Sequence, residues 1–174
     1  MSADEKPEFH RWETLYQERP VESLPWFNPE LDDDLKQALD ELGLRDGTAL
    51  DLGTGPGTQA MQLARRGFDV TATDISEAAI SLARGKAEAQ GLNITWIQDD
   101  ILDTRLAQRF DLIFDRGCFH VLAPERRQGY VGIVSGLLKP GAYMFLKCFS
   151  HLQPGELGPY RFTPEQLREL FGKI

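Results

Sequence analysis

Three glycines spaced two residues apart follow a short apolar run near residue 50. The run Thr48–Leu52 is typical of a buried strand, and Gly53, Gly55 and Gly57 come directly after it. Glycine allows the positive φ angles of a tight turn and lets a ligand approach the backbone closely. A helix that begins at Thr58 would present unpaired N–H groups to a carboxylate or phosphate. The spacing therefore predicts a site for a nucleotide-like ligand between this strand and the next helix.

A carboxylate distinguishes this turn from a dinucleotide-binding loop. Asp51 stands two residues before the first glycine. The dinucleotide fingerprint reads G-x-G-x-x-G, whereas the glycines here are evenly spaced. A carboxylate at this place would repel a pyrophosphate but suit a cationic amino group. The turn therefore departs from the pattern of NAD-binding proteins.

An acid also follows each of the next three expected strands. These acids are Asp74, Asp100 (next to Asp99) and Asp115. The carboxyl ends of parallel strands meet at the edge where such sheets bind ligands. A carboxylate at Asp74 can accept both hydroxyls of a ribose, with helix capping as its alternative role. One acid near an adenine can accept its exocyclic amine, and two adjacent acids point apart, so only one of the pair serves.

The elements that must position these residues alternate between strand and helix. We expect strands at 48–52, 69–73, 94–97, 110–114 and 142–147, and helices near 8–19, 29–42, 58–66, 76–90, 124–138 and 163–171. This alternation predicts βαβ units and a parallel sheet with right-handed crossovers. Asn28, Ser76 and Thr163 are the expected N-caps of three of the helices.

Charge is distributed unevenly along the 174 residues. The net charge is −8, and residues 1–47 carry this whole excess, with 13 acids and 5 bases. An acidic chain without a basic face argues against nucleic acid as the main partner. The run Asp32–Asp34 is interpreted as a solvated helix start, where acids favour the helix dipole, and not as a metal cluster.

The remaining composition is that of a cytoplasmic protein. No apolar run approaches the ~20 residues that a membrane helix needs. The polar first ten residues are unlike a signal peptide. Cys118 and Cys148 are therefore expected to be free thiols.

The four acid-bearing sites together resemble the motifs of class I S-adenosylmethionine (SAM) dependent methyltransferases, from about Thr48 to Phe171. The resemblance implies SAM as the cofactor, S-adenosylhomocysteine (SAH) as the product, and a Rossmann-like doubly wound sheet in the order 3-2-1-4-5 with helices on both faces. It divides the chain into an aromatic cap, 1–46, and a SAM-binding core, 47–174. The cofactor-binding residues that it implies are Asp51, Gly53, Thr54, Gly55, Gly57, Thr58, Asp74, Ile75, Asp100, Ile101, Asp115, Trp12 and Trp26.

Within that set, the resemblance assigns individual roles. Asp74 would hold the ribose, Ile75 would lie against the adenine, and Asp100 would reach the adenine amine with Ile101 beside it. The family usually adds an antiparallel hairpin after its last helix, and no residues remain for it after Ile174. We therefore expect the hairpin to be missing and the last parallel strand to be an edge. A fragment of a longer protein is the favoured explanation, and cover from another segment or a second chain is the alternative.

The segment Phe114–Leu122 resembles the corresponding region of the thiopurine and tellurite-resistance type small-molecule methyltransferases. These proteins also begin with an aromatic segment over the cofactor, a part that Trp12, Tyr16, Trp26 and Phe27 would play here. Two residues of the segment are candidates for catalysis. Arg116 could pair with a substrate anion or with a nearby acid of the chain. His120 could be a general base or a substrate contact, or only the partly buried start of a helix.

The predicted reaction is methyl transfer to a small molecule, with a soft nucleophile such as a thiol as the acceptor. Such a transfer depends mainly on alignment in a closed site, and a thiolate needs little help from a base. No metal site is predicted. Two alternatives remain open at this point: an NAD(P)-dependent Rossmann oxidoreductase, and a non-catalytic protein that binds SAM or a nucleotide.

Overall fold

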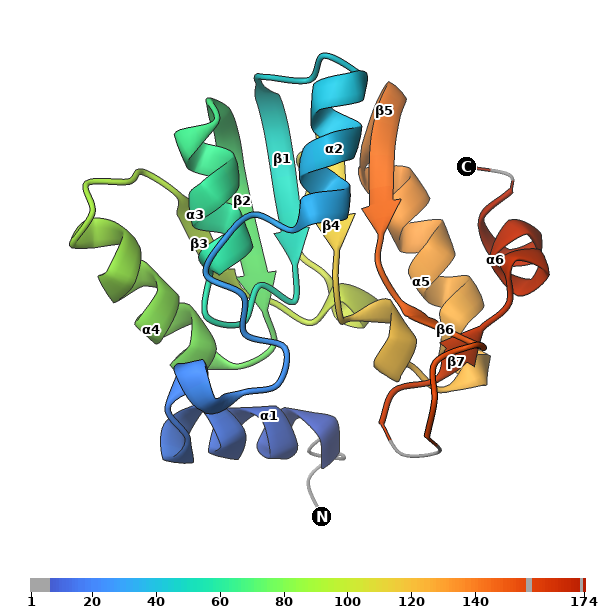
Figure 1. Ribbon diagram of the computed structural model, residues 1–174, viewed down its shortest axis with the longest axis horizontal. Coiled ribbons are helices and arrows are strands. Elements are labelled where there is room, and N and C mark those ends of the chain that lie inside the picture. Colours follow the sequence, from blue (N-terminus) through green and yellow to red (C-terminus); the bar gives the residue numbers. More distant parts are fainter. Residues whose placement is uncertain (1–6, 156–157, 173) are drawn as a thin grey trace.

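A five-stranded parallel sheet runs through the chain, with helices on both of its faces (Figure 1). The computed structural model describes residues 7–155, 158–172 and 174. Its strands are β1 (Gly47–Leu52), β2 (Phe68–Asp74), β3 (Thr95–Gln98), β4 (Phe110–Asp115), β5 (Leu138–Leu146), β6 (Phe149–Ser150) and β7 (Arg161–Phe162). Its α-helices are α1 (Pro7–Glu18), α2 (Asp33–Glu41), α3 (Thr58–Arg65), α4 (Glu77–Glu88), α5 (Pro124–Leu137) and α6 (Pro164–Phe171); the 3-10 turns are η1 (Val21–Ser23), η2 (Ile101–Asp103) and η3 (Phe119–Val121).

The strand order is β3-β2-β1-β4-β5, which confirms the predicted order. All four strand pairs are parallel. Leu52 at the end of β1 is paired with Thr73 on one side and with Asp115 on the other. The register therefore brings the carboxyl ends of the central strands, and the acids that follow them, to one edge of the sheet.

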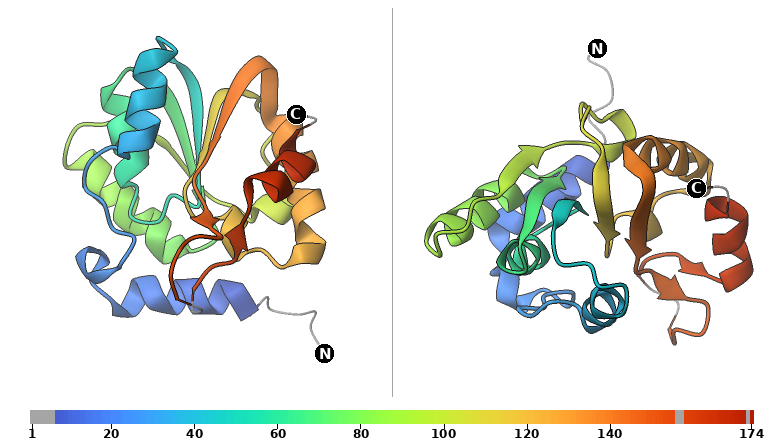
Figure 2. Two further views of the ribbon diagram at one scale, coloured as in Figure 1. Left: turned by 45° about the vertical axis from the view of Figure 1, so that its right-hand side comes forward. Right: turned by 90° about the horizontal axis from the view of Figure 1, so that it is seen from above.

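Alternating side chains of β1 face two separate cores. Ala49 packs with apolar residues of α2 and α3, whereas Leu50 and Leu52 pack with those of α5 and α6. Figure 2 shows α2 and α3 on one side of the sheet and α5 on the other. The consecutive apolar residues Ala49 and Leu50 follow from this burial on both faces.

The N-terminal helix lies outside these layers. It crosses below the carboxyl ends of the strands, next to α4 (Figure 1). Tyr16, Val21 and Leu24 form a third apolar cluster there with Ala79 of α4. The aromatic segment is therefore ordered on the ligand-binding edge and belongs to neither main core.

The second helix begins later than the sequence predicts. Asn28 accepts a hydrogen bond from the backbone N–H of Glu30 (3.1 Å), which makes a local turn and not a helix cap. Asp32 is the N-cap, because its side chain accepts from the N–H groups of Asp34 and Leu35. The interpretation of residues 32–34 as solvated is also wrong for Asp32, which is 2% exposed.

Two differences occur near the C-terminus. Strand β5 begins at Leu138, so residues 139–141, where we expected a turn, belong to the strand. A shift of register between Phe110 and Leu112 of β4 accommodates these additional strand residues. The expectation that a C-terminal pair of strands is missing is corrected, because β6 and β7 form a small second sheet. The two strands pair in parallel and precede α6, and with two residues each they carry no clear sequence signal. Thr163 does cap α6, and Gln166 completes its capping box. Within the described part of the chain, β5 pairs with β4 only.

Candidate active site

The glycine turn (residues 53–57) has the geometry that its sequence predicts. Gly53, Gly55 and Gly57 have φ angles of 61°, 52° and 75°, which other residues rarely adopt. A Cβ atom at Gly57 would lie 2.6 Å from the Cβ of Ala83 and 2.6 Å from the Trp96 ring. The turn therefore requires glycine at this position both for its backbone angles and for space.

The end of β2 holds the turn in place, and α3 begins directly behind it. Thr54 donates its backbone N–H to the carbonyl of Thr73 at 2.9 Å. Gly57 is the N-cap of α3, and Thr58 is the first residue of the helix. The N-terminus of α3 consequently faces the turn, as expected from the sequence.

Asp51 lies beneath the glycine turn, 3% exposed. Its carboxylate accepts hydrogen bonds from the Thr54 hydroxyl (2.5 Å) and from the backbone N–H of Ala60 in the first turn of α3. Burial, with a smaller contribution from the charges of Asp115 and Asp74, raises its pKa to about 7. The carboxylate is thus oriented by the turn and is strongly disfavoured as an isolated negative charge.

Asp74 joins the turn to the start of α4. Its Oδ2 accepts from the N–H of Gly55 (2.8 Å) and its Oδ1 from the N–H of Ser76 (2.9 Å). Burial raises its pKa to about 6, although these hydrogen bonds oppose the shift. Asp74 therefore acts as a structural acceptor in this structure, and each carboxylate oxygen retains lone pairs that could receive a ligand hydroxyl.

These two acids provide a test of the implied cofactor. Both are buried, both have raised pKa values, and neither is hydrogen-bonded to a cationic side chain among the described residues. A ligand that carries positive charge would lower the free-energy cost of burying these two carboxylates in their ionised form. SAM carries a sulfonium and an ammonium group, so the residues present fit the cofactor that the sequence predicts.

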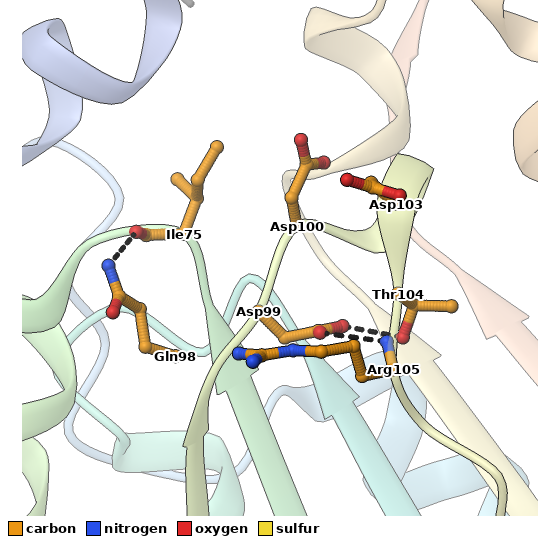
Figure 3. Close-up of a pocket in the computed structure, with 7 residues that line it drawn as sticks. All are labelled: Ile75, Gln98, Asp99, Asp100, Asp103, Thr104 and Arg105. Carbon is orange, nitrogen blue, oxygen red and sulfur yellow. Dashed lines mark hydrogen bonds between the residues drawn. The ribbon is translucent and has the colours of Figure 1, made fainter. Parts of the chain in front are cut away.

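A pocket of about 590 Å³ opens beside the ends of β2 and β3. Its lining is formed by Ile75, Gln98, Asp99, Asp100, Asp103, Thr104 and Arg105 (Figure 3). Its volume falls within the range of small-molecule sites, which is roughly 300–1,000 Å³. An apolar side chain and an acid at its edge are the features that an adenine would use.

The two adjacent acids of this pocket do point apart, as Figure 3 shows. Asp99 accepts from the hydroxyl of Thr104 (2.6 Å) and from the N–H of Arg105 (3.1 Å), and so fixes the loop after β3. Asp100 lies between Ile75 and Asp103 in this view and accepts from the backbone N–H of Leu102 (3.0 Å). Sequence reasoning missed Gln98, whose amide donates to the carbonyl of Ile75 (3.2 Å) at the same pocket. Its position at the end of a strand was the available signal.

Two predicted cofactor residues lie elsewhere or are already engaged. Ile101 is 7% exposed and packs in the core formed with α5. Asp115 is fully buried, and its carboxylate accepts from three successive backbone N–H groups, those of residues 117–119, and from the hydroxyl of Tyr130. Asp115 thereby shapes the loop that follows β4.

That loop approaches the glycine turn and carries His120. A Cβ atom at Gly53 would lie 3.3 Å from the Cβ of Cys118. The ring of His120 is 9% exposed and meets Phe149 edge to face at 5.4 Å. Its Nδ1 is buried without a hydrogen-bond partner in the described chain. Burial lowers the pKa of His120, opposed by the charge of Asp115, so the imidazole is neutral at pH 7.

Arg116, the other candidate for catalysis, is paired with neither Asp115 nor Asp51. Its Nε lies 3.1 Å from Oδ2 of Asp32, and its Nη1 donates to the carbonyl of Trp26 (2.9 Å). The sequence offered no signal for this pairing, because the partners lie in segments that are distant along the chain.

The aromatic N-terminal segment contacts the glycine turn through Tyr16. A Cβ atom at Gly55 would lie 2.6 Å from the Tyr16 hydroxyl. The Trp26 side chain is hydrogen-bonded to Tyr16, and Trp12 packs edge to face on Trp26 with ring centroids 5.7 Å apart. Trp12 and Trp26 therefore support the residue that reaches the turn.

Glu13 is a further contact that sequence reasoning missed. It accepts from the hydroxyl of Ser76 (2.7 Å) and from the N–H of Ala78 (3.2 Å). It thus anchors α1 at the beginning of α4, where helix dipoles favour negative charge. Among the described residues, no group of His, Cys, Asp and Glu could hold a metal ion, and no helix is both long and apolar enough to cross a membrane.

Comparisons with known proteins agree with this geometry. A family model described as a methyltransferase domain matches residues 49–141. A 2-heptyl-1-hydroxyquinolin-4(1H)-one methyltransferase from Mycobacteroides abscessus is 35% identical over 159 residues, which are 89% of this chain and 68% of that protein.

Two solved structures extend the comparison. The first, reported for the conversion of a disulfide bond into a thioacetal group during echinomycin biosynthesis, has a TM-score of 0.79 and 28% identity, and the match covers 94% of this chain and 76% of that one. TehB from Haemophilus influenzae shares the fold, with a TM-score of 0.71, 24% identity, and coverage of 82% and 50%. The chain belongs to the class I SAM-dependent methyltransferases, and SAM is its cofactor.

Proposed function

We propose that this methyltransferase acts on a small molecule with a soft nucleophile, and that the nucleophile is a thiol. The observation that carries the proposal is the chemistry around the β4 loop. The imidazole of His120 is neutral at pH 7 because burial lowers its pKa. The carboxylate of Asp115 already accepts four hydrogen bonds from the chain. Such surroundings suit an acceptor that ionises easily, because a thiol reaches its reactive form near neutral pH.

On this proposal, the cofactor lies between the glycine turn and the pocket after β3. Asp51 and the N-terminus of α3 would face its charged amino-acid end. Asp74 would receive the ribose hydroxyls through its remaining lone pairs, and Ile75 and Asp100 would contact the adenine. These assignments require no rearrangement of β1 or β2, since all five features already lie at the same edge of the sheet.

When bound, SAM supplies an activated methyl group on its sulfonium. The chain's own contribution is to exclude water and align the acceptor, a form of catalysis that can supply ~7–11 kcal/mol. The acceptor sulfur would receive this methyl group, and SAH would leave with the electron pair of the bond that held it. The thiol proton leaves before or during this step, and the neutral imidazole of His120 can accept it. The products are a methyl thioether and SAH.

Two of the compared proteins support different acceptors. The structure from echinomycin biosynthesis concerns a disulfide and a thioacetal, which favours sulfur. The relative from Mycobacteroides abscessus is named for a hydroxyquinolinone, which favours a hydroxylated heteroaromatic ring as the second candidate. A hydroxyl group with a higher pKa would depend more strongly on His120 than a thiol would.

A panel of acceptors tests the proposal. Purified protein is incubated with SAM and with thiols, selenols, phenols and hydroxylated quinolines, and SAH formation is measured. We expect the thiols and selenols to turn over faster than oxygen acceptors of similar size. Calorimetric titration with SAH and with NAD provides the control for the site, with SAH expected to bind and NAD not. If only the quinolines are methylated, the acceptor is a hydroxylated heteroaromatic ring and not a thiol.

The remaining expectations complete the proposal. We propose that the aromatic part of residues 1–46 that precedes α2 forms a cap, and that α2 belongs with residues 47–174 to the catalytic core, against which it packs. We also propose that the protein works in the cytoplasm without a nucleic-acid partner. The acidic balance of the chain supports the last point. The cap is supported by the contact between Tyr16 and the glycine turn.

A further inference from the structure

Asp32 occupies an unusual position for an acid in a run of acids. Its side chain is 3% exposed, whereas that of its neighbour Asp34 is 80% exposed. One carboxylate oxygen caps α2 through the N–H groups of Asp34 and Leu35. The other oxygen faces away from the helix and binds two cations, Arg116 at 3.1 Å and Lys147 at 2.8 Å.

The two cations come from the catalytic edge of the sheet. Arg116 is the first residue after β4, and Lys147 is the first residue after β5. The backbone N–H of Lys147 also donates to the carbonyl of Asp115 (2.8 Å), so its position depends on the end of β4. Asp32 therefore joins the loops that follow two neighbouring strands.

A third connection leads from the same residue to the glycine turn. The backbone N–H of Asp32 donates to Gln59 (2.8 Å), which belongs to the first turn of α3. Gln59 in turn donates to the carbonyl of Glu30 (2.8 Å). The segment before α2 is thus held against the helix whose N-terminus faces the cofactor site.

Arg116 connects this arrangement to the aromatic residues. It donates to the backbone carbonyl of Trp26, whose side chain is hydrogen-bonded to Tyr16 at Gly55. A continuous path of contacts therefore runs from Asp32, through Arg116 and Trp26, to the glycine turn. Arg116 thereby ties the N-terminal segment to the loop after β4, and that segment reaches the glycine turn through Tyr16.

We propose that Asp32, Arg116 and Lys147 form an ionic latch that holds the N-terminal segment (residues 12–31) over the cofactor site, with Asp32 as its positioning residue. Arg116 acts in this latch through Asp32 and Trp26, and does not bind a substrate anion. The inference rests on SAM binding and is independent of the nature of the acceptor.

Helix capping alone does not account for this arrangement. Asparagine caps a helix as well as aspartate does, and it would avoid the desolvation of a buried charge. The charge is instead matched by two cations from distant loops, 84 and 115 residues along the chain. Buried ion pairs contribute little net stability but define which segments must meet, and this is the property that a latch needs.

Asp32→Asn tests the latch because it preserves the cap and removes the charge. Asp33→Asn is the matched control, since Asp33 is exposed in the same turn of the same helix. The readout is amide hydrogen exchange of peptides within residues 12–31 in the free protein, together with calorimetric SAH binding. We expect Asp32→Asn to speed this exchange and to weaken SAH binding about tenfold, the lower end of what the loss of a charge-assisted hydrogen bond produces. Asp33→Asn should leave both unchanged.

A double-mutant cycle separates the latch from a substrate-binding Arg116. If both residues act in one unit, Asp32→Asn combined with Arg116→Gln should weaken SAH binding no more than the stronger single variant. Additive effects, or a rise in KM for the acceptor with Arg116→Gln alone, would overturn the proposal.

Lys147→Gln provides a variant that leaves the N-terminal segment itself untouched and that applies even if Asp32→Asn does not fold. It should raise exchange in residues 12–31 in the same direction, by a smaller factor, because Arg116 still holds Asp32. If Asp32→Asn and Lys147→Gln lower only the melting temperature, and exchange and SAH affinity match those of Asp33→Asn, the three residues are structural and the latch does not exist.

Discussion

The two halves of the site are built in different ways. On the cofactor side, the key contact joins Gly55 and Asp74, which are 19 residues apart. On the side formed by the residues that follow β4 and β5, Arg116 reaches Trp26 over 90 residues and Lys147 reaches Asp32 over 115. The first half is set by one strand–turn–helix unit and its neighbour, and the second only by how the whole chain folds. Changes in the first should therefore act on binding directly, and changes in the second through position.

The largest effect is expected on the cofactor side, from Gly57→Ala. The new Cβ would meet Ala83 and the ring of Trp96 at 2.6 Å, on a backbone with a φ of 75°. Strain in the left-handed region and overpacking together should lower the free energy of unfolding by about 2–5 kcal/mol and abolish SAH binding. Urea denaturation and calorimetry measure the two effects.

Gly85→Ala is the matched control for that change. Gly85 lies within α4, and a Cβ atom there would meet nothing within 4 Å. The same substitution should therefore stabilise the protein by about 0.5–1 kcal/mol, because alanine favours a helix more than glycine does. A Gly57→Ala variant that is as stable as Gly85→Ala and still binds SAH would show that the turn tolerates a side chain, contrary to its geometry.

Asp51→Asn should separate stability from binding. Because burial raises the pKa of Asp51 to about 7, the folded state binds more protons than the unfolded state between pH 4 and 7. The loss of stability that the buried Asp51 charge causes in the wild type is therefore complete above pH 7 and absent below pH 4. The amide can still accept from Thr54, so the variant should be more stable than the wild type at pH 8, by at most about 4 kcal/mol, and equal to it near pH 4.

SAH binding should respond to Asp51→Asn in the opposite sense. The variant removes the negative charge that faces the cofactor's amino group, so its affinity should fall at pH 8 while its stability rises. Urea denaturation at pH 4 and pH 8 measures the stability of the variant and the wild type, and calorimetric titration at pH 8 measures their affinity for SAH. A variant that is less stable at pH 8 would show that Asp51 is already neutralised in the free protein.

Asp74→Ala should have an intermediate effect. We expect SAH to bind about 1.5–3 kcal/mol more weakly, because a charge-assisted hydrogen bond to the ribose is lost. The hydrogen bonds to Gly55 and Ser76 are lost as well, so Asp74→Asn serves as the control that retains an acceptor. Affinity within twofold of the wild type in the alanine variant would limit Asp74 to its structural role.

The contrast between the halves also explains what the sequence could predict. The glycine turn and the caps at Ser76 and Thr163 were predictable, because each depends on a short pattern of residue types. The strand order was predictable from the resemblance to a known family and not from the pattern alone. The burial of Asp32 was not, because a run of three acids carries no sign that one of them faces two distant cations. Asn28 failed as a helix cap for a different, local reason, since a turn to Glu30 engages its side chain.

The sheet's last strand shows the same limit. The apolar residues after Gly141 predicted a strand, but its beginning at Leu138 depends on pairing with Phe110 across a register shift. The pairing of β6 with β7 is likewise set by tertiary packing and not by their two-residue sequences. Local pattern therefore specified which elements form, and non-local packing decided where several of them begin.

The smallest effect is expected on the acceptor side, from His120→Gln with a thiol substrate. A thiol with a pKa near 8.5 supplies some thiolate without help, so kcat/KM at pH 7 should fall only about tenfold. A phenolic acceptor, with a pKa near 10, should lose more, within the roughly 10²–10⁴ range of general-base catalysis. Equal losses for both acceptors would mean that His120 positions the loop and takes no proton.

Stability provides the independent check on the state of His120. Burial lowers the pKa of its imidazole below 6.5, so the unfolded state binds more protons than the folded state in the interval just below pH 6.5. The contribution of His120 to stability is therefore complete above pH 6.5 and is lost as the pH falls through the lower, folded-state pKa. The wild type should lose this contribution between pH 7.5 and 5, whereas His120→Gln, which has no titrating group there, should not. If urea midpoints of the two proteins change in parallel over this interval, the imidazole is not held neutral by burial, and the tenfold effect on turnover must have another origin.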